Sequence, residues 1–365
     1  SQIVTFGTMA AKAAIRDVTR VLNIPYAVSS RLVEMIPNEL KITLDKALET
    51  SKKLKAAYEN DSQARKIIDL ARELEGLPRH ASVHAAGIVI SKKPLIEYLP
   101  LQDLKGTVVT QFDKDKIEEL GLLKMDFLGL RTLTIIADTI ANVKENFGVE
   151  IDIDKIPLDD KRTAEMLSKG NTGAVFQMES AGMTKLVRDL KPTCFQDLIP
   201  TIALFRPGPL GSGMVKDFID GKHGLRQPSY LHPKLEPILR ETYGVILYQE
   251  QVMQIVQALA GFTLGQADIL RRAMAKKKMS IIIAQKENFL KGCTANGIEI
   301  SLAEKIFGLL EHFADYGFNK SHSAAYALLA WQTAYLKAYY PAEFIAATLS
   351  SVMDSDKIAV YIELA

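Results

Sequence analysis

Apolar residues recur every three to four positions from about residue 8 to about residue 80. This spacing is typical of helices that bury one face, and two prolines interrupt it, so it predicts several helices. Lys12, Arg16 and Arg20 are spaced by four residues and therefore lie on one face of the first predicted helix. Two interpretations of this face stay open: a solvated surface, or a stripe that contacts phosphates.

Between about residues 83 and 127 the pattern changes to short apolar runs, namely HAAGIVIS, TVVTQF and GLLKMDF. Gly, Pro and clusters of Lys and Asp separate these runs, as they commonly separate strands. The segment therefore predicts a small sheet, and it is too short to be a complete domain.

Residues 122–127 are expected to form one strand of this sheet, with side chains that alternate between its two faces. Three apolar side chains are expected to point into the core: Leu123, Met125 and Phe127. Lys124 and Asp126 would then project together from the other face. A carboxylate beside an ammonium group suits a site for a metal ion and a phosphate. A surface ion pair is the alternative, and the spacing alone favours it.

Helices dominate again from about residue 131 to the end of the sequence. Helix breaks are predicted where Gly or Pro interrupts the pattern, at Gly148, Pro157, Gly170-Asn171, residues 206–213, Pro228, Gly261, Gly292 and Pro341. Because helices flank a sheet segment on both sides in the sequence, the predicted fold class is α+β and mostly helical.

The segment ALFRPGPLGSGM, residues 203–214, contains two prolines and three glycines after an apolar helix, which predicts a rigid, shaped loop. Arg206 stands at the entrance of this loop, where its guanidinium could bind a phosphate with two hydrogen bonds. The segment is not a P-loop, because no Gly-Lys-Ser/Thr follows the glycines. A purely structural turn is the alternative.

The segment GFTLGQADILRRAMAKKK, residues 261–278, is the most informative of the chain. Thr263 followed by Gln266 is a capping-box pattern, which predicts that a helix begins there. One side of this helix is apolar, with Ala267, Leu270, Ala273 and Met274. The other side carries Arg271, Arg272, Lys276 and Lys278, with Asp268 as the one acid among them. This patch suits a polyphosphate or a nucleic-acid backbone, and a solvated helix C-terminus is the alternative.

The last informative segment, residues 316–341, predicts a long helix that ends before a proline. Asn319 or Ser321 is placed to cap it. Lys320 and His322 lie at its N-terminus, where free backbone N–H groups favour an anion, so they form a second candidate phosphate site. Helix capping together with core aromatic residues is the alternative.

Composition adds limits to this picture. The 365 residues are enough for two or three domains, and 45 Lys and Arg against 43 Asp and Glu give a net charge of +2. Binding to nucleic acid would therefore need the local basic patches described above. Two cysteines cannot form a disulfide framework, which favours a reducing cytoplasm. No apolar run approaches the ~18 residues of a membrane span, so no membrane association is expected.

Two further patterns in the sequence resemble metal sites. His80 and His84 have the spacing of zinc ligands on a helix, but their segment is typical of a strand and no cysteine lies nearby. The D-x-D pairs, of which Asp152 and Asp154 are the most strand-like, are interpreted as solvated charge.

Seven ordered segments together resemble one protein family: FGTMAAKAAIRDV, KMDFLGLRTLTII, VFQMES, LFRPGPLGSGM, YGVILYQEQVMQI, LRRAMAKKK and FNKSHSAAYALLAWQTAYLKAYYPAEF. This is the family of alpha (catalytic) subunits of bacterial DNA polymerase III, the C-family replicative DNA polymerases. The resemblance runs over nearly the whole chain. It implies a palm similar to the nucleotidyltransferase fold of DNA polymerase beta, with a helical thumb and helical fingers. The implied limits are 1–5 for the end of the first palm stretch, 6–80 for the thumb, 81–131 for the second palm stretch and 132–365 for the fingers.

The resemblance also implies an activity. The family transfers a nucleotidyl group from a deoxynucleoside triphosphate to a primer 3′-hydroxyl, with two Mg²⁺ ions that three palm aspartates hold. Asp126 matches the third of these aspartates, and Lys124 matches the basic residue two positions before it, expected near the triphosphate. Arg271 and Arg272 match arginines of the fingers that face the triphosphate.

By the same analogy, further residues are expected to line the nucleotide cleft: Arg206, Asn319, Lys320, Ser321 and His322. Basic residues of the thumb and fingers are expected to contact DNA: Lys12, Arg16, Arg20, Lys276 and Lys278. The implied partners are primer-template DNA and deoxynucleoside triphosphates and, in the full-length protein, the sliding clamp, the clamp-loader tau subunit and the proofreading exonuclease.

One departure from the family pattern limits these expectations. The other two aspartates belong to a P-D-F-D-type motif whose position falls before Ser1. The chain is therefore expected to be a central fragment that is inactive alone. Two alternatives stay open: an error-prone paralogue that serves lesion bypass, and a module that only binds DNA and nucleotides.

Overall fold

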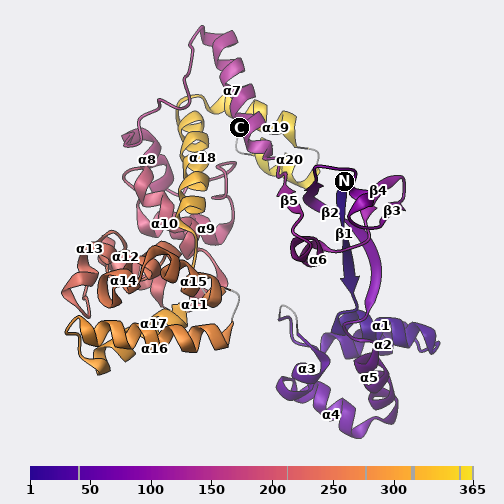
Figure 1. The fold of residues 1–365 in the computed structure, drawn as a ribbon. Helices are drawn as coiled ribbons and strands as arrows, with labels where there is room; N and C mark the ends of the chain where they lie inside the picture. The colour runs from indigo at the N-terminus through magenta and orange to yellow at the C-terminus, as the bar shows by residue number, and fades with distance from the viewer. Residues whose placement is uncertain (40–41, 212, 276–277, 314–316, 353–354, 364–365) are drawn as a thin grey trace. The chain divides into compact units, whose positions relative to one another are not determined.

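The computed structural model describes residues 1–39, 42–211, 213–275, 278–313, 317–352 and 355–363 (Figure 1). The chain divides between Gly129 and Leu130 into two compact units, and each unit is described here by itself. Among the described helices, none is both long and apolar enough to cross a membrane.

The first unit begins with a strand, continues with five helices and closes with most of a sheet. Its elements are β1 (Gln2–Thr8), α1 (Ala11–Val21), α2 (Tyr26–Glu34), α3 (Leu44–Thr50), α4 (Lys52–Asn60), α5 (Ser62–Leu74), β2 (Pro78–Ile90), the 3₁₀ helix η1 (Leu95–Glu97), β3 (Leu101–Leu104), β4 (Thr107–Thr110), α6 (Lys114–Glu119) and β5 (Leu123–Asp126).

The five helices confirm the helical pattern of the N-terminal segment. They enclose their own core, in which Ile15, Leu32, Leu54 and Ile67 are fully buried. Local capping fixes where the helices begin. At the start of α5, for example, the Asp61 carboxylate accepts hydrogen bonds from the N–H groups of the first turn, at 2.9 and 3.1 Å.

The sheet is mixed, with the strand order β3-β4-β1-β2-β5. β1 pairs in parallel with β4, and the other neighbours pair antiparallel. The three apolar runs HAAGIVIS, TVVTQF and GLLKMDF contribute to β2, β4 and β5, so the prediction of strands there is confirmed. β2 already begins at Pro78, and the central strand β1 comes from the N-terminus, which the pattern did not predict.

The predicted orientation of β5 is wrong. Leu123, Met125 and Phe127 are 58, 45 and 59% exposed and do not enter the core. Lys124 pairs directly with Val89, which is 3% exposed and belongs to the sheet's core. Because directly paired residues point to the same face of a sheet, Lys124 and Asp126 lie on the core face instead.

The second unit is helical in all its described elements. They are α7 (Arg131–Phe147), α8 (Lys161–Ser168), α9 (Ala181–Leu190), η2 (Phe195–Leu198), α10 (Ile199–Leu204), α11 (Pro207–Gly211), α12 (Met214–Lys222), η3 (Pro233–Leu235), α13 (Glu236–Leu239), η4 (Arg240–Thr242), α14 (Gln249–Ala260), α15 (Leu264–Ala275), α16 (Met279–Ala295), α17 (Ile300–Phe313), α18 (Lys320–Tyr339), α19 (Pro341–Ser351) and α20 (Ser355–Ile362).

Most of the predicted helix breaks are present. α7 and α14 end at Gly148 and Gly261, whose φ angles of 65° and 71° suit glycine, and α19 begins at Pro341. Two breaks differ. Residues 207–211 form the short helix α11 instead of a loop, and α16 runs without a break through Gly292.

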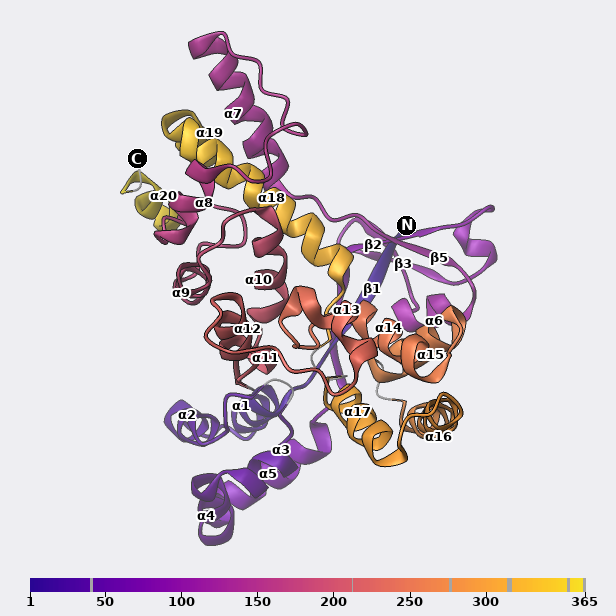
Figure 2. The ribbon, with the colours of Figure 1, turned by 90° about the vertical axis from the view of Figure 1, so that its left-hand side faces the viewer.

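Helix α18 is the centre of the upper half of this unit, with α8 and α10 against it (Figure 1). Asn319 caps it and Pro341 follows its end, as predicted. Trp331 is fully buried, and its indole N–H donates to the Pro157 carbonyl at 3.0 Å. α14 to α17 enclose a second core around Ile255, Phe289 and Phe307 (Figure 2).

A buried lysine on α18 makes the stability of this unit depend on pH. The ammonium group of Lys337 is held by Asn171 Oδ1 at 2.6 Å and by the Gly173 carbonyl at 2.8 Å, and burial lowers the pKa of Lys337 from 10.5 to about 8. Between these two values the unfolded chain binds more protons than the folded chain, so the free energy of unfolding rises with pH there.

In the unchanged chain, Lys337 is expected to raise the free energy of unfolding by up to about 1.4 kcal/mol per pH unit between pH 8 and 10.5. Lys337→Met is expected to remove this rise. Urea unfolding at half-unit steps, with both proteins in the same buffers, measures this difference and cancels the titration of all other groups. Parallel stability curves for the two proteins would contradict the prediction.

Candidate functional site

The Lys124–Asp126 pair lies at the end of β5 in the first unit. Lys124 Nζ donates to Asp126 Oδ2 at 2.7 Å, and the side chains are 16 and 44% exposed. This hydrogen bond lowers the pKa of the Asp126 carboxyl, and the positive charges of Lys124 and Lys114 lower it further. The carboxylate is therefore fully ionised at neutral pH and open to solvent on one side.

An irregularity of β2 shapes the strand opposite Asp126. The pairing of β2 with β1 jumps from Val83 to Ile88, so the intervening residues bulge out of the ladder. His84 Nδ1 accepts hydrogen bonds from the N–H groups of Ala86 at 3.2 Å and Gly87 at 2.7 Å, and Gly87 is the residue that pairs with Asp126. His84 thus fixes the backbone beside the carboxylate, a role that its zinc-like spacing did not suggest.

Gly87→Ala is expected to lower the free energy of unfolding by about 1–3 kcal/mol, because its Cβ would lie 2.8 Å from His84 Nδ1. Urea unfolding of the chain measures the change. Gly129→Ala is the matched control, since a Cβ at Gly129 meets nothing within 4 Å. Equal stabilities of the two variants would contradict a close fit of His84 on Gly87.

The residues near Asp126 supply one carboxylate to a metal ion. Mg²⁺ requires oxygen ligands in octahedral geometry, commonly from more than one carboxylate together with water and substrate phosphates. Within the described ranges, no three His, Cys, Asp or Glu side chains cluster as a metal site would require. Asp126 fits the role of a single ligand, and the described residues do not complete a two-metal site around it.

In the second unit, Arg271 and Arg272 are bound to a neighbouring acid. The capping box of α15 is present, with Thr263 N–H donating to Gln266 Oε1 at 2.9 Å and Gln266 N–H donating to Thr263 Oγ1 at 3.3 Å. The carboxylate of Asp268, in the same helix, accepts hydrogen bonds from Arg271 at 2.7 Å and from Arg272 at 2.8 Å.

These hydrogen bonds lower the pKa of the Asp268 carboxyl. The hydrogen bond from Arg271 has the largest effect. The predicted apolar side of the helix is correct, since Ala267 and Leu270 are fully buried. The basic side is less cationic than expected, because the two arginines share one carboxylate.

Gln249 joins α15 to the segment before α18. Its side-chain oxygen accepts from Arg271 Nη1 at 3.2 Å, and its side-chain nitrogen donates to the Gly317 carbonyl at 3.3 Å. Its backbone N–H donates to the Phe318 carbonyl at 2.8 Å. Arg271 is therefore positioned against the N-terminus of α18, although 48 residues or more separate them in the sequence.

The N-terminus of α18 already holds an anion from the protein itself. The Lys320 backbone N–H donates to both carboxylate oxygens of Glu250, at 3.0 and 3.1 Å. Lys320 Nζ donates to the Glu241 carboxylate at 2.6 and 2.8 Å. The sequence predicts an anion site at this position, and in the structure two carboxylates of the chain itself lie there.

Arg206 and His322 meet around an aromatic cluster. The Arg206 guanidinium lies 4.4 Å from the centre of the Phe318 ring, and the rings of His322 and Tyr326 are 4.1 Å apart. These side chains line a hollow of about 490 Å³, whose wall also contains Glu179. Partial burial lowers the pKa of the Arg206 guanidinium. The hollow therefore combines aromatic rings, a guanidinium group and one carboxylate.

Two of the three basic residues of α1, Lys12 and Arg20, have partners within the chain. Lys12 Nζ donates to Asn38 Oδ1 at 3.2 Å, and Arg20 pairs with Asp17 at 3.3 Å. Arg16 is exposed, has no ion pair within the described ranges, and lines a hollow of about 460 Å³ together with Arg20. In the second unit, Lys278 is exposed, whereas Lys276 lies outside the described residues.

The structure therefore brings together Arg206 and His322 in one hollow, and Arg271, Asn319 and Lys320 in one network. It also joins Lys124 to Asp126 in the other unit. The sequence analysis missed the residues that hold these side chains: His84, Glu241, Tyr248, Gln249 and Glu250. The motif YGVILYQEQVMQI contains three of them, but its pattern gave no sign of their contacts.

Comparisons with known proteins match both units. Residues 1–129 match the model of the bacterial DNA polymerase III alpha NTPase domain. Residues 132–297 match the model of the bacterial DNA polymerase III alpha subunit finger domain. The gap between the two matches coincides with the division of the structure between Gly129 and Leu130.

Curated relatives are similar along the whole chain. DNA polymerase III subunit alpha of Pseudomonas aeruginosa is 53% identical over 375 residues, which cover 100% of this chain and 32% of that protein. The proteins of the same name in Escherichia coli K12 and Haemophilus influenzae are 53 and 54% identical, over 99 and 98% of this chain and 32% of each protein. The chain thus spans about a third of the length of these relatives.

Proposed function

Because the chain belongs to the family of bacterial DNA polymerase III alpha subunits, we propose that it forms part of the polymerase core of a replicative DNA polymerase. The reaction is template-directed transfer of a nucleotidyl group from a deoxynucleoside triphosphate to a primer 3′-hydroxyl. The observation that carries this proposal is the identity of about 53% over the whole chain to proteins named DNA polymerase III subunit alpha.

We assign the parts of the polymerase as follows. Residues 1–5 and 81–131 form part of a palm of the DNA polymerase beta type, and the five-stranded mixed sheet supports this assignment. Residues 6–80, which contain α1 to α5, form the thumb. Residues 132–365 form the fingers, and the match of the finger-domain model to residues 132–297 supports this.

The proposed chemistry begins at Asp126. Magnesium ions in such enzymes stabilise the charge of the attacking and leaving oxygens. Asp126 is ionised and partly exposed, which suits one ligand to such an ion, and further ligands would have to come from outside the described residues. Lys124, with its ammonium group 2.7 Å from Asp126, is placed to bind a triphosphate oxygen when that ion pair opens.

The fingers residues are assigned to the incoming nucleotide. Arg271 and Arg272 would release Asp268 and bind the triphosphate instead. Phosphate oxygens accept hydrogen bonds from guanidinium groups as well as carboxylate oxygens do. Arg206, with the aromatic surface of Phe318 and His322, would contact the base or sugar. Asn319 and Lys320 hold the start of α18 beside them.

The DNA contacts are assigned to the basic residues Lys12, Arg16, Arg20, Lys276 and Lys278, of which Arg16, Arg20 and Lys278 have exposed side chains. Such contacts neutralise phosphates and release counterions, so DNA affinity is expected to fall steeply as salt rises. Sliding clamp, clamp-loader tau subunit and proofreading exonuclease are proposed as partners of the full-length protein, in the cytoplasm.

Primer extension tests the proposal. The 365-residue chain is compared with a chimera in which it replaces the matching third of the Escherichia coli relative, in the presence of Mg²⁺ and all four deoxynucleotides. The chimera is expected to extend the primer, and the chain alone is expected to bind primer-template DNA without extending it. A folded chimera that cannot extend would contradict the proposal. Extension by the chain alone would place the remaining metal ligands within it.

A further inference from the structure

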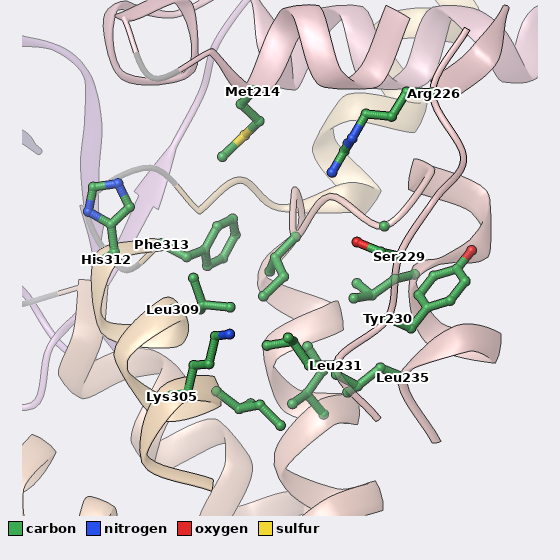
Figure 3. A pocket seen from close by; sticks show the side chains of 15 residues that line it. Met214, Arg226, Ser229, Tyr230, Leu231, Leu235, Lys305, Leu309, His312 and Phe313 are labelled. Atoms are coloured by element: carbon green, nitrogen blue, oxygen red, sulfur yellow. The ribbon is translucent and has the colours of Figure 1, made fainter. Parts of the chain in front are cut away.

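We propose that a cavity in the second unit binds a small amphipathic anion, a molecule with an apolar body and one acidic head group. The cavity has a volume of about 310 Å³ and lies among α13, α14, α17 and the loop before η3 (Figure 3). It contains none of the residues assigned above to nucleotide, metal or DNA. The proposed function does not require it.

The walls of the cavity select for an apolar body. Leu235, Leu239, Ile255 and Ile306 line it and are at most 4% exposed, so their side chains form a fixed apolar surface. Apolar walls with a few polar groups are typical of sites for small ligands, and this volume lies at the small end of their range. The size suits a bicyclic aromatic or a short-chain acid.

The two charged side chains that line the cavity, Arg226 and Lys305, are both cationic. The titratable side chains that line it are Arg226, Lys305 and His312, with the phenol of Tyr230, and no acidic residue is among its described lining residues. Lys305 and His312 lie two turns apart on one face of α17. Figure 3 shows the guanidinium of Arg226 and the ammonium group of Lys305 directed toward the hollow from opposite sides.

Arg226 is the more buried of the two cationic side chains that line the cavity. Its Nη1 is buried and has no hydrogen-bond partner in the described part of the chain. The nearest acid is Asp217, whose Oδ2 lies 3.7 Å from Nη1, too far for a hydrogen bond. The Arg226 side chain as a whole is 37% exposed, so an acidic head group in the cavity would bind the accessible part of the guanidinium through charge-assisted hydrogen bonds. The charge of Arg226 and the apolar walls together therefore define an amphipathic anion.

Calorimetric titration of the 365-residue chain with 2-naphthoate tests the proposal. The neutral analogue 2-naphthalenemethanol has the same apolar body without the charge. We expect saturable 1:1 binding of 2-naphthoate, and binding of the alcohol that is at least tenfold weaker. Equal affinities for the two compounds, or no saturable binding of 2-naphthoate, would overturn the proposal.

Substitutions of residues that line the cavity test whether 2-naphthoate binds there. Arg226→Met is expected to weaken 2-naphthoate binding at least tenfold, and Leu309→Trp, which fills the space, is expected to abolish it. Lys305→Met tests the charge at an exposed position whose replacement leaves the fold intact, and it is expected to weaken binding about threefold. Lys291→Met, on the exposed face of α16, is the control and should bind as the unchanged chain does. Unchanged binding in both Arg226→Met and Lys305→Met would refute an anion site here.

Discussion

Asp126→Asn is expected to reduce primer extension by the chimera at least a thousandfold, with little loss of DNA binding. The amide keeps the shape of the side chain but removes the negative charge that would hold a metal ion, and a bound metal contributes a large part of transition-state stabilisation. Single-turnover extension of a labelled primer measures the rate, and a filter-binding titration of primer-template DNA measures the affinity.

Asp115→Asn is the matched control for this substitution. Asp115 is an exposed acid of the same unit, on α6, and forms no ion pair in the described part of the chain. It should extend primers at the rate of the unchanged chimera. If Asp126→Asn extends primers at a rate within tenfold of the unchanged chimera, Asp126 is not a metal ligand. This result would not affect the other assignments.

Gly292→Ala is expected to destabilise the second unit by about 2–4 kcal/mol. A Cβ at Gly292 would lie 2.2 Å from the Ala260 carbonyl oxygen and 3.0 Å from the Ala260 Cα. Both are backbone atoms at the end of α14, which cannot turn away as a side chain would. The helices α14 and α16 must therefore move apart, which opens the core around Phe289.

Gly308→Ala is the control for this substitution, and it is expected to stabilise the second unit instead. Gly308 lies within α17, and a Cβ there meets nothing within 4 Å. Alanine has a higher helix propensity than glycine, so this variant should be about 0.5–1 kcal/mol more stable than the unchanged chain. Urea unfolding measures both changes. If Gly292→Ala is as stable as Gly308→Ala, the close approach of α14 and α16 is not present.

Features that depend on neighbouring residues could be predicted from the sequence. The capping box of Thr263 and Gln266 and the cap at Asn319 form within one helical turn, so the pattern that predicts them contains both partners. The same holds for the apolar side of α15. These predictions needed no knowledge of the rest of the fold.

Features that depend on distant partners could not be predicted. The direction of Lys124 follows from Val89, with which it pairs across the sheet, and not from the alternation within β5. Gly292 resembles a helix break in the sequence, but its reason is the carbonyl of Ala260 on another helix. In each case the local pattern allowed two outcomes, and tertiary packing decided between them.

The candidate site shows the same limit for charge. Lys320 is bound by Glu250 and Glu241, which lie 70 and 79 residues before it. Their positions gave no reason to pair them with the start of α18. The sequence therefore predicted where cationic groups gather, but not how many of their charges the chain itself compensates.

This compensation has a consequence for how an anion reaches the fingers. The three cations Arg271, Arg272 and Lys320 face three carboxylates, those of Asp268, Glu241 and Glu250, so these groups together carry no net charge. Such a group of pairs creates little field beyond its own dimensions and does not steer a ligand from afar. A phosphate would therefore bind here only by replacing a carboxylate as the partner of a cation. The displaced carboxylate would then form hydrogen bonds with water or with other donors. Discrimination between anions then depends on how well each one replaces a carboxylate, and little on its total charge.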